Sequence, residues 1–200
     1  MTVRPKTADV REACVAEAFR IVEAAGVESL SLRDVARRLG VSHQAPYKHF
    51  PSRGHMLAEI IARSFDDFSA FLQSRPSENE PKADLQAMGS LYMAYARQHP
   101  LQYRLMFNTP MPDPGQHPEM MAKARFAFGI LRDRLAQMPL RPVPGALPSP
   151  ELDALFVWSA LHGLASLLQS DVFETLGLSE AEGALSVERC FARIDLALGA

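Results

Sequence analysis

A short polar segment between residues 42 and 53 holds side chains whose types and spacing suit contact with DNA. A glutamine can make two hydrogen bonds to adenine, a lysine and a tyrosine hydroxyl suit phosphate oxygens, and an alanine can contact the thymine methyl group. Arginines at the start of two neighbouring predicted helices place positive charge where phosphates would lie. The candidate DNA-binding residues are Arg33, Ser42, His43, Gln44, Ala45, Tyr47, Lys48, His49 and Arg53.

The residues around Gly40 predict two short helices joined by a tight turn. Apolar residues recur at helical spacing before Gly40, and glycine readily adopts the left-handed conformation that such a turn needs. Ser31 followed by Asp34 predicts a capping box at the first helix, and Ser42 is the predicted N-cap of the second. Pro46 lies in the first turn of that second helix, which is therefore expected to be short. The layout is typical of a helix-turn-helix, although a helical hairpin with a solvated polar face would show the same spacing.

Nearly every other segment also has the apolar spacing of a helix, and none has the alternation typical of a strand. Two proline-rich loops, at residues 108–118 and 139–150, interrupt this pattern. Ser179 with Glu182 predicts a capping box before the last helix. The expected fold is all-α with about nine helices. Outside the helix-turn-helix, the expected helical ranges are 9–25, 53–74, 82–98, 101–107, 119–138, 151–169 and 182–198.

Composition and charge fit an ordinary globular protein. Of the 200 residues, 48% are hydrophobic and 22% are charged, and the net charge is −2. The charge is uneven, because residues 1–63 carry ten Lys or Arg against seven Asp or Glu, whereas residues 64–200 carry eleven against sixteen. The positive end contains the helix-turn-helix, and DNA phosphate attracts that sign. Both cysteines, Cys14 and Cys190, are expected to be small buried apolar residues in a reducing cytosol.

The longest uncharged run, residues 154–170, is expected to be buried in protein and not to span a membrane. It includes Ser159, His162 and Gln169, and it is short for a bilayer-spanning helix. The first residues lack the apolar centre of a signal peptide. We therefore expect a cytoplasmic protein without a membrane partner.

Residues 22–57 resemble the DNA-binding domain of the TetR family of bacterial transcription regulators. The features that carry this resemblance are Gly26, Ser31, Val35-Ala36, Gly40-Val41-Ser42, the run Tyr47-Lys48-His49-Phe50, and Arg53. The family usually has lysine where Arg53 stands, and an aliphatic residue is commoner where Pro46 stands. Further along the chain, Trp158 with His162-Gly163 is similar to a subgroup of the family marked by a Trp–His–Gly signature.

The resemblance implies a two-domain homodimer that binds a palindromic operator, responds to a small effector and more often represses than activates. It divides the chain into a DNA-binding domain of three helices, at residues 1–52, and a ligand-binding and dimerisation domain, at residues 53–200. One helix-turn-helix makes few base contacts, so proteins with this motif usually bind as dimers to two related half-sites. No cofactor is implied.

Two further sets of residues are candidates for the effector site and the dimer interface. Aromatic and methionine side chains could line a mostly apolar pocket, and apolar residues of the last long helices could pack against a second copy. Ordinary core packing is the alternative for each residue taken singly. The ligand candidates are Phe65, Phe68, Tyr92, Tyr103, Met106, Phe107, Phe126, Trp158 and His162. The dimer candidates are Leu161, Leu164, Leu168, Val187, Phe191 and Ile194.

Two other classes of protein compete with a DNA-binding regulator. A small all-α enzyme is one, but the sequence has no HExxH motif, no glycine-rich phosphate loop and no nucleophile elbow. A helical adaptor that binds other proteins is the second. An adaptor would not need Gln44, Lys48 and Arg53 gathered beside a tight helix-turn-helix.

Overall fold

A computed structural model describes residues 7–74, 80–142, 144–145 and 147–199 of the chain. These residues form nine α-helices and two short 3-10 helices, and no strand occurs among them, so the all-α prediction is confirmed. They divide into two compact units. The N-terminal unit holds the described residues up to Asp66 together with Leu101–Ala124, and the C-terminal unit holds Asp67–Pro100 and the described residues from Arg125 on. The predicted functional division after residue 52 stays a prediction.

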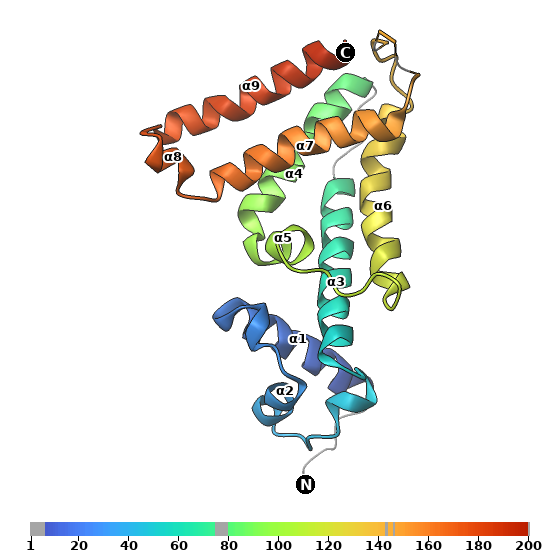
Figure 1. The fold of residues 1–200 in the computed structure, drawn as a ribbon, viewed down its shortest axis with the longest axis vertical. Coiled ribbons are helices and arrows are strands. Elements are labelled where there is room, and N and C mark those ends of the chain that lie inside the picture. Colours follow the sequence, from blue (N-terminus) through green and yellow to red (C-terminus); the bar gives the residue numbers. More distant parts are fainter. Residues whose placement is uncertain (1–6, 75–79, 143, 146, 200) are drawn as a thin grey trace. The chain divides into compact units, whose positions relative to one another are not determined.

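The N-terminal unit surrounds a small apolar core with short helices. α1 packs against α2, and the turns that follow these two helices contain Gly26 and Gly40, both with positive φ angles (Figure 1). Cys14, Val35 and Ile60 are among the fully buried residues. The elements are α1 (Thr7–Ala25), η1 (Val27–Ser29), α2 (Leu32–Leu39), η2 (Pro46–Lys48), the first part of α3 (Arg53–Gln73), α5 (Pro100–Phe107) from Leu101 on, and the start of α6 (Pro118–Leu135).

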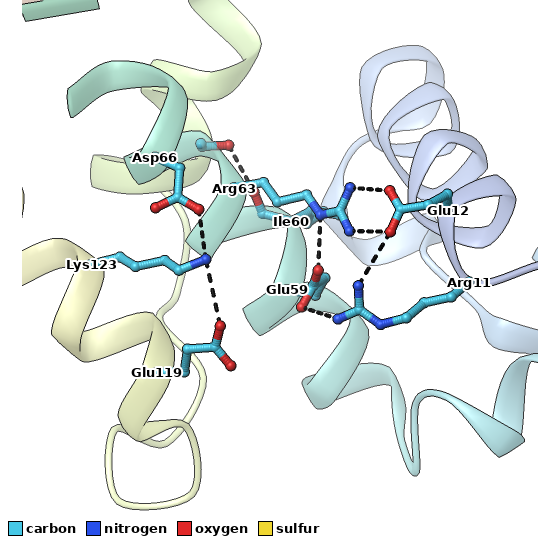
Figure 2. A network of polar contacts seen from close by, with 9 residues as sticks. Arg11, Glu12, Glu59, Ile60, Arg63, Asp66, Glu119 and Lys123 are labelled. Atoms are coloured by element: carbon cyan, nitrogen blue, oxygen red, sulfur yellow. Dashed lines mark hydrogen bonds and ion pairs between the residues drawn. The ribbon is translucent and has the colours of Figure 1, made fainter. Parts of the chain in front are cut away.

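A network of ion pairs fixes α1 and α6 to α3 within the N-terminal unit (Figure 2). Arg63 of α3 donates to both carboxylate oxygens of Glu12 on α1, at 2.5 and 2.7 Å, and to Glu59 one turn earlier at 2.8 Å. Arg11 of α1 also reaches Glu59, at 2.8 Å. Lys123 of α6 forms an ion pair with Asp66 of α3 at 2.6 Å. Charge pairing therefore adds to apolar packing in holding these helices together.

The C-terminal unit is built around α7, which packs against both α4 and α9. Figure 1 shows α7 and α9 side by side. A buried ion pair joins two other helices, because Asp84 on α4, which has no exposed surface, lies 2.5 Å from Arg134 on α6. The elements are the remainders of α3 and α6 with α4 (Pro81–Gln98), α7 (Pro150–Leu168), α8 (Val172–Thr175) and α9 (Glu180–Leu198).

Helix boundaries differ from the predicted ones mainly at prolines. Four helices begin at a proline, one residue earlier than expected, because the first helical position needs no N–H donor: Pro81, Pro100, Pro118 and Pro150. The capping box of Ser179 and Glu182 is present. The short helix α8 was not predicted, and Cys190 is only half-buried.

The capping box predicted at α2 is wrong. The Ser31 side chain makes no capping hydrogen bond, and the Asp34 carboxylate accepts hydrogen bonds from Arg37 and from Arg38, the latter at 2.8 Å. Two guanidinium donors on the next turn of the same helix outcompete one backbone N–H for this carboxylate.

The ion pairs of Glu12 predict a pH-dependent contribution to stability. The hydrogen bonds from Arg63 lower the pKa of Glu12 from 4.5 to about 2. A carboxylate whose pKa is lower in the folded state stabilises it above the unfolded pKa, and this contribution is lost as the pH falls toward the folded value. Glu12→Gln should therefore lower the free energy of unfolding near pH 7 by less than about 1 kcal/mol, since the pair is partly solvated, and the difference should vanish near pH 2.

Urea unfolding at several pH values measures this difference. Glu23→Gln is the matched control, because Glu23 is an exposed residue of α1 without an ion pair among the described residues. A Glu12→Gln difference that stayed constant from pH 7 to pH 2 would contradict the assignment.

Candidate DNA-binding site and regulatory region

The segment after the turn is not the α-helix that was predicted to begin at Ser42. Residues 43–45 form a turn, and η2 follows as a 3-10 helix. Pro46 is the physical reason: it has no N–H, so the Ser42 carbonyl accepts from the Ala45 N–H at 2.9 Å. After Pro46, the Phe50 N–H reaches the Pro46 carbonyl at 2.9 Å. Helical geometry is thus recovered only beyond the proline.

Burial sorts the residues of this segment into two groups. Pro46 and Phe50 are buried in the N-terminal unit, and Ala45 and His49 are half-buried. The remaining polar candidates face solvent, and they are Ser42, His43, Gln44, Tyr47 and Lys48. The apolar anchors therefore leave a compact set of hydrogen-bonding side chains free to meet base edges and phosphates.

The basic residues around the segment differ in whether an acidic partner already holds them. Arg33 and Lys48 are exposed and make no ion pair with any residue that the structure describes. Arg37 and Arg38, by contrast, both bind Asp34, and these arginines hold the pKa of that carboxyl below its usual value. Arg33 and Lys48 are therefore the better phosphate candidates, because no internal ion pair has to be broken.

Arg53 has a structural task in addition to any contact with DNA. Its guanidinium donates to the Leu30 carbonyl at 3.0 Å and to the Val27 carbonyl at 2.7 Å. Both acceptors belong to the connection between α1 and α2, so Arg53 fixes this connection to the start of α3. The predicted phosphate contact of Arg53 stays a prediction, since its side chain also remains partly exposed.

Substitution of Arg53 tests this positioning role. Lysine keeps the charge but cannot donate to two carbonyls in the fork geometry of a guanidinium. Arg53→Lys should therefore lower the free energy of unfolding by about 1 kcal/mol, measured by urea unfolding. Arg20→Lys is the control, because Arg20 is highly exposed and, within the part of the chain that the structure describes, bonds only to Glu17 in the preceding turn. Equal effects of the two substitutions would refute the positioning role.

The nine predicted ligand residues are divided between the two units. Phe65, Tyr103 and Met106 are buried in the N-terminal unit, where Phe107 packs edge-on against the first two at 6.0 and 5.0 Å between ring centroids. In the C-terminal unit Phe126 is 56% exposed. The other members there are Phe68, Tyr92, Trp158 and His162. For the rings in the N-terminal unit, the structure fits ordinary core packing.

Three of these residues share hydrogen bonds at one tyrosine hydroxyl. The Trp158 ring N–H donates to the Tyr92 hydroxyl at 3.3 Å, and this hydroxyl lies 3.1 Å from Nδ1 of His162. Burial lowers the pKa of His162, which favours its neutral form. The neutral ring can accept a hydrogen bond from the Tyr92 hydroxyl, so the polar atoms of these three side chains are paired with one another.

Two cavities are described, and both lie in the C-terminal unit. One, of about 630 Å³, is bounded by α4, α7, α8 and α9, and none of the nine predicted ligand residues lines it. The other, of about 480 Å³, runs along α6 and has Phe126 among its lining residues. Among the described residues, no group of three His, Cys, Asp or Glu side chains could hold a metal ion.

Two predicted dimer residues belong to the core of their own chain. Leu161 and Ile194 are only 5% and 4% exposed, which favours core packing for both, and their place in a dimer interface stays a prediction. Phe191 is half-buried and packs so closely on α4 that a Cβ atom added to Gly89 would clash with its ring. Leu164, Leu168 and Val187 are half-buried or exposed, and for these three the prediction stays open.

A different set of apolar residues on α7 and α9 faces solvent. With about 3.6 residues per turn, Leu152 and Phe156 lie on the side of α7 opposite Leu161. The helical spacing of this second face was visible in the sequence, but which face the chain itself buries was not. The exposed set is Leu152, Leu155, Phe156, Leu167, Leu185 and Leu196. By length and composition α7 could also cross a membrane, a test that core helices of soluble proteins pass equally.

Comparison with known proteins gives matches over both parts of the chain. Residues 15–60 match the model of bacterial regulatory proteins of the tetR family, and residues 85–194 match a tetracyclin repressor-like C-terminal domain. The chain is 28% identical over 173 residues to an uncharacterized HTH-type transcriptional regulator of Mycobacterium tuberculosis, covering 83% of this chain and 73% of that protein. It is 30% identical over 189 residues to the HTH-type transcriptional repressor DrrR1 of Streptomyces coeruleorubidus, covering 89% of this chain but only 61% of the repressor.

Solved structures show the same fold. A protein of unknown function from Rhodococcus sp. RHA1 superposes with a TM-score of 0.79 at 22% identity, covering 99% of this chain and 98% of that one. The TetR family transcriptional regulator PfmR from Thermus thermophilus gives a TM-score of 0.61 at 22% identity, covering 94% and 97%. The match to the C-terminal domain alone spans more than half of the chain, and the helix-turn-helix match precedes it. The chain therefore belongs to the TetR family of ligand-responsive transcriptional regulators and not to a class of enzymes.

Proposed function

We propose that the chain is a repressor that binds a palindromic operator as a homodimer and is released by a small, mostly apolar effector. The observation that carries this proposal is the exposed polar segment at residues 42–48, which buried Pro46 and Phe50 anchor to the N-terminal unit. Beside it, Arg33 and Lys48 make no ion pair with any described residue. Regulators of the family bind DNA and act as dimers. One matched relative is named a transcriptional repressor, which supports repression over activation here.

The exposed residues divide into two roles at the operator. Gln44 offers an amide that can make two hydrogen bonds to adenine, so it contributes sequence preference. Lys48, Arg33 and the Tyr47 hydroxyl suit phosphates, which set affinity and register whatever the sequence. Cytoplasmic residence follows from a function on chromosomal DNA.

These roles predict that substitutions of Lys48 and Gln44 change different properties of DNA binding. Lys48→Met should weaken binding to all DNA sequences alike and reduce the slope of log affinity against log salt by about 1. Gln44→Ala should leave that slope unchanged and should reduce the preference for the correct base by about 1–3 kcal/mol. Fluorescence anisotropy with operators selected from random DNA measures both quantities.

Arg193→Met provides a control for loss of charge, since Arg193 is exposed on α9 far along the chain from the DNA-binding segment. Equal loss of affinity from Arg193→Met and Lys48→Met would refute the assigned contact. No selection of any DNA sequence by the unmodified chain would refute the proposed function as a whole.

The exposed apolar faces of α7 and α9 support a dimer interface in the C-terminal unit. Leu152 is 64% exposed, Phe156 45% and Leu196 62%, on two helices that pack against each other, and large exposed apolar surface marks association sites. Glu188 and Arg189, exposed on α9, would supply a charged rim. A second copy bringing the same face would bury these side chains in a bundle of four helices.

Introducing a charge on this face should separate the dimer. Phe156→Asp would place a carboxylate in the proposed interface, so sedimentation velocity should show monomers at concentrations where the unmodified chain is dimeric. Phe126→Asp is the matched control, because Phe126 is exposed to a similar extent but lies on α6. A Phe156→Asp protein that remained dimeric would place the interface elsewhere.

A further inference from the structure

We infer that the cavity bounded by α4, α7, α8 and α9 is the effector site and that it takes a neutral, mostly apolar molecule. This inference rests on the proposed function, since it assigns the place where the effector acts. It also replaces the predicted set of aromatic residues, none of which lines this cavity.

The size and lining of the cavity suit a small organic molecule. Its volume of about 630 Å³ lies within the range of small-molecule sites, which are mainly apolar with a few polar groups. Short side chains on three helices leave the space open, with Ala94 on α4, Ala165 on α7 and Gly183 on α9. Larger apolar side chains complete the lining, namely Met93, Leu168, Phe173, Leu178, Val187 and Phe191.

Gly183 contributes space rather than an unusual backbone conformation. It lies in α9 without a positive φ, and a Cβ there would meet the Leu168 side chain at an ordinary 3.4 Å. Alanine would therefore fit this position, and it would favour the helix more than glycine does. Glycine here leaves room in the cavity at the expense of helix stability.

The polar groups at the cavity favour a ligand without net charge. Arg97 and Glu180 line the cavity with opposite charges, and neither makes an ion pair among the described residues. Arg97 would attract an anionic ligand but Glu180 would repel it, and a cationic ligand would be attracted by Glu180 and repelled by Arg97. The Gln169 amide donates to the Ala96 carbonyl at 3.2 Å, which leaves its own carbonyl oxygen to accept a ligand hydroxyl.

The last turn of α4 connects this cavity to α3. Ala96 and Arg97 of this turn line the cavity, and Tyr95 of the same turn stacks on His99, the residue that caps α4, at 4.5 Å between ring centroids. Phe71 of α3 contacts both of these rings, at 5.4 and 5.7 Å. A ligand that displaces this turn would therefore act on α3, the helix that also carries Arg53 and Arg63.

Filling the cavity covalently tests the inference without knowledge of the natural effector. In a Cys190→Ala background, Cys14 is fully buried, so Ala184→Cys would present the one accessible thiol, at the mouth of the cavity. N-phenylmaleimide would then place a neutral phenyl group there. Ala70→Cys, labelled in the same way, is the matched control, because Ala70 is exposed on α3 and lines neither described cavity.

Labelling at residue 184 should lower operator affinity at least fivefold, a typical size for coupling between two sites, and labelling at residue 70 should change it less than twofold. Unchanged affinity after labelling at 184 would overturn the inference while leaving the proposed function intact, because the unlabelled protein would still bind its operator. An unlabelled protein that selects no DNA would overturn both.

Direct binding of fluorescent probes tests the ligand class. The alcohol 4-(1-pyrenyl)butanol should bind the unlabelled protein, and labelling at residue 184 but not at residue 70 should weaken this binding at least fivefold. The corresponding pyrenyl carboxylate and amine should both bind more weakly than the alcohol. Tighter binding of either charged probe would overturn the neutral class, and binding that labelling at 184 did not affect would overturn the site.

Discussion

Two arginines of α3 hold the N-terminal helices in place, and the segment that we propose to read DNA depends on them. Arg53 bonds to backbone carbonyls between α1 and α2, and Arg63, almost three turns later, binds Glu12 on α1. Both bind through several nitrogen atoms, which fixes direction as well as distance. Because one helix supplies both arginines, a movement of α3 would be felt at both ends of α1.

Internal contacts of this kind also decide which basic side chains remain available for DNA. A helix-turn-helix needs positive charge near phosphates, but it also needs cations to join its own helices. Here Arg38 and Arg53 serve the fold through Asp34 and backbone carbonyls, whereas Arg33 and Lys48 have no such internal partner among the described residues. Charge alone in the sequence does not reveal this division, since it depends on which acids the fold brings near.

The sequence predicted the helices well because their signals are local. Apolar periodicity, the glycine at residue 40 and the capping box at Ser179 each act within a few residues, and the structure contains all three. Pro46 was read correctly as a limit on helix length, but its effect was larger than expected, because the lost N–H leaves only a turn and a 3-10 helix. The short helix α8 lacked any sequence pattern long enough to detect.

The regulatory residues were harder to predict because they depend on which face each helix buries. An amphipathic helix with two apolar faces, such as α7, gives the same periodicity whether a face meets its own chain or another. Leu161 was therefore predicted at an interface, whereas it is buried within its own chain, and Phe156, which faces solvent, was not among the predicted residues. Likewise, most of the aromatic residues that suggested a pocket are buried or half-buried, whereas the open cavity is lined by short side chains together with larger apolar ones such as Met93 and Phe173.

The most direct test of operator binding by a dimer is a footprint of the full chain on DNA that flanks its own gene, measured at several salt concentrations. We expect protection of one palindromic site whose half-sites are centred about 10 base pairs apart or a multiple of that spacing, with affinity falling steeply as salt rises. Protection of a single unpaired half-site would contradict binding as a dimer. Absence of any sequence-specific footprint would contradict the assignment of residues 42–53 as the DNA-reading segment.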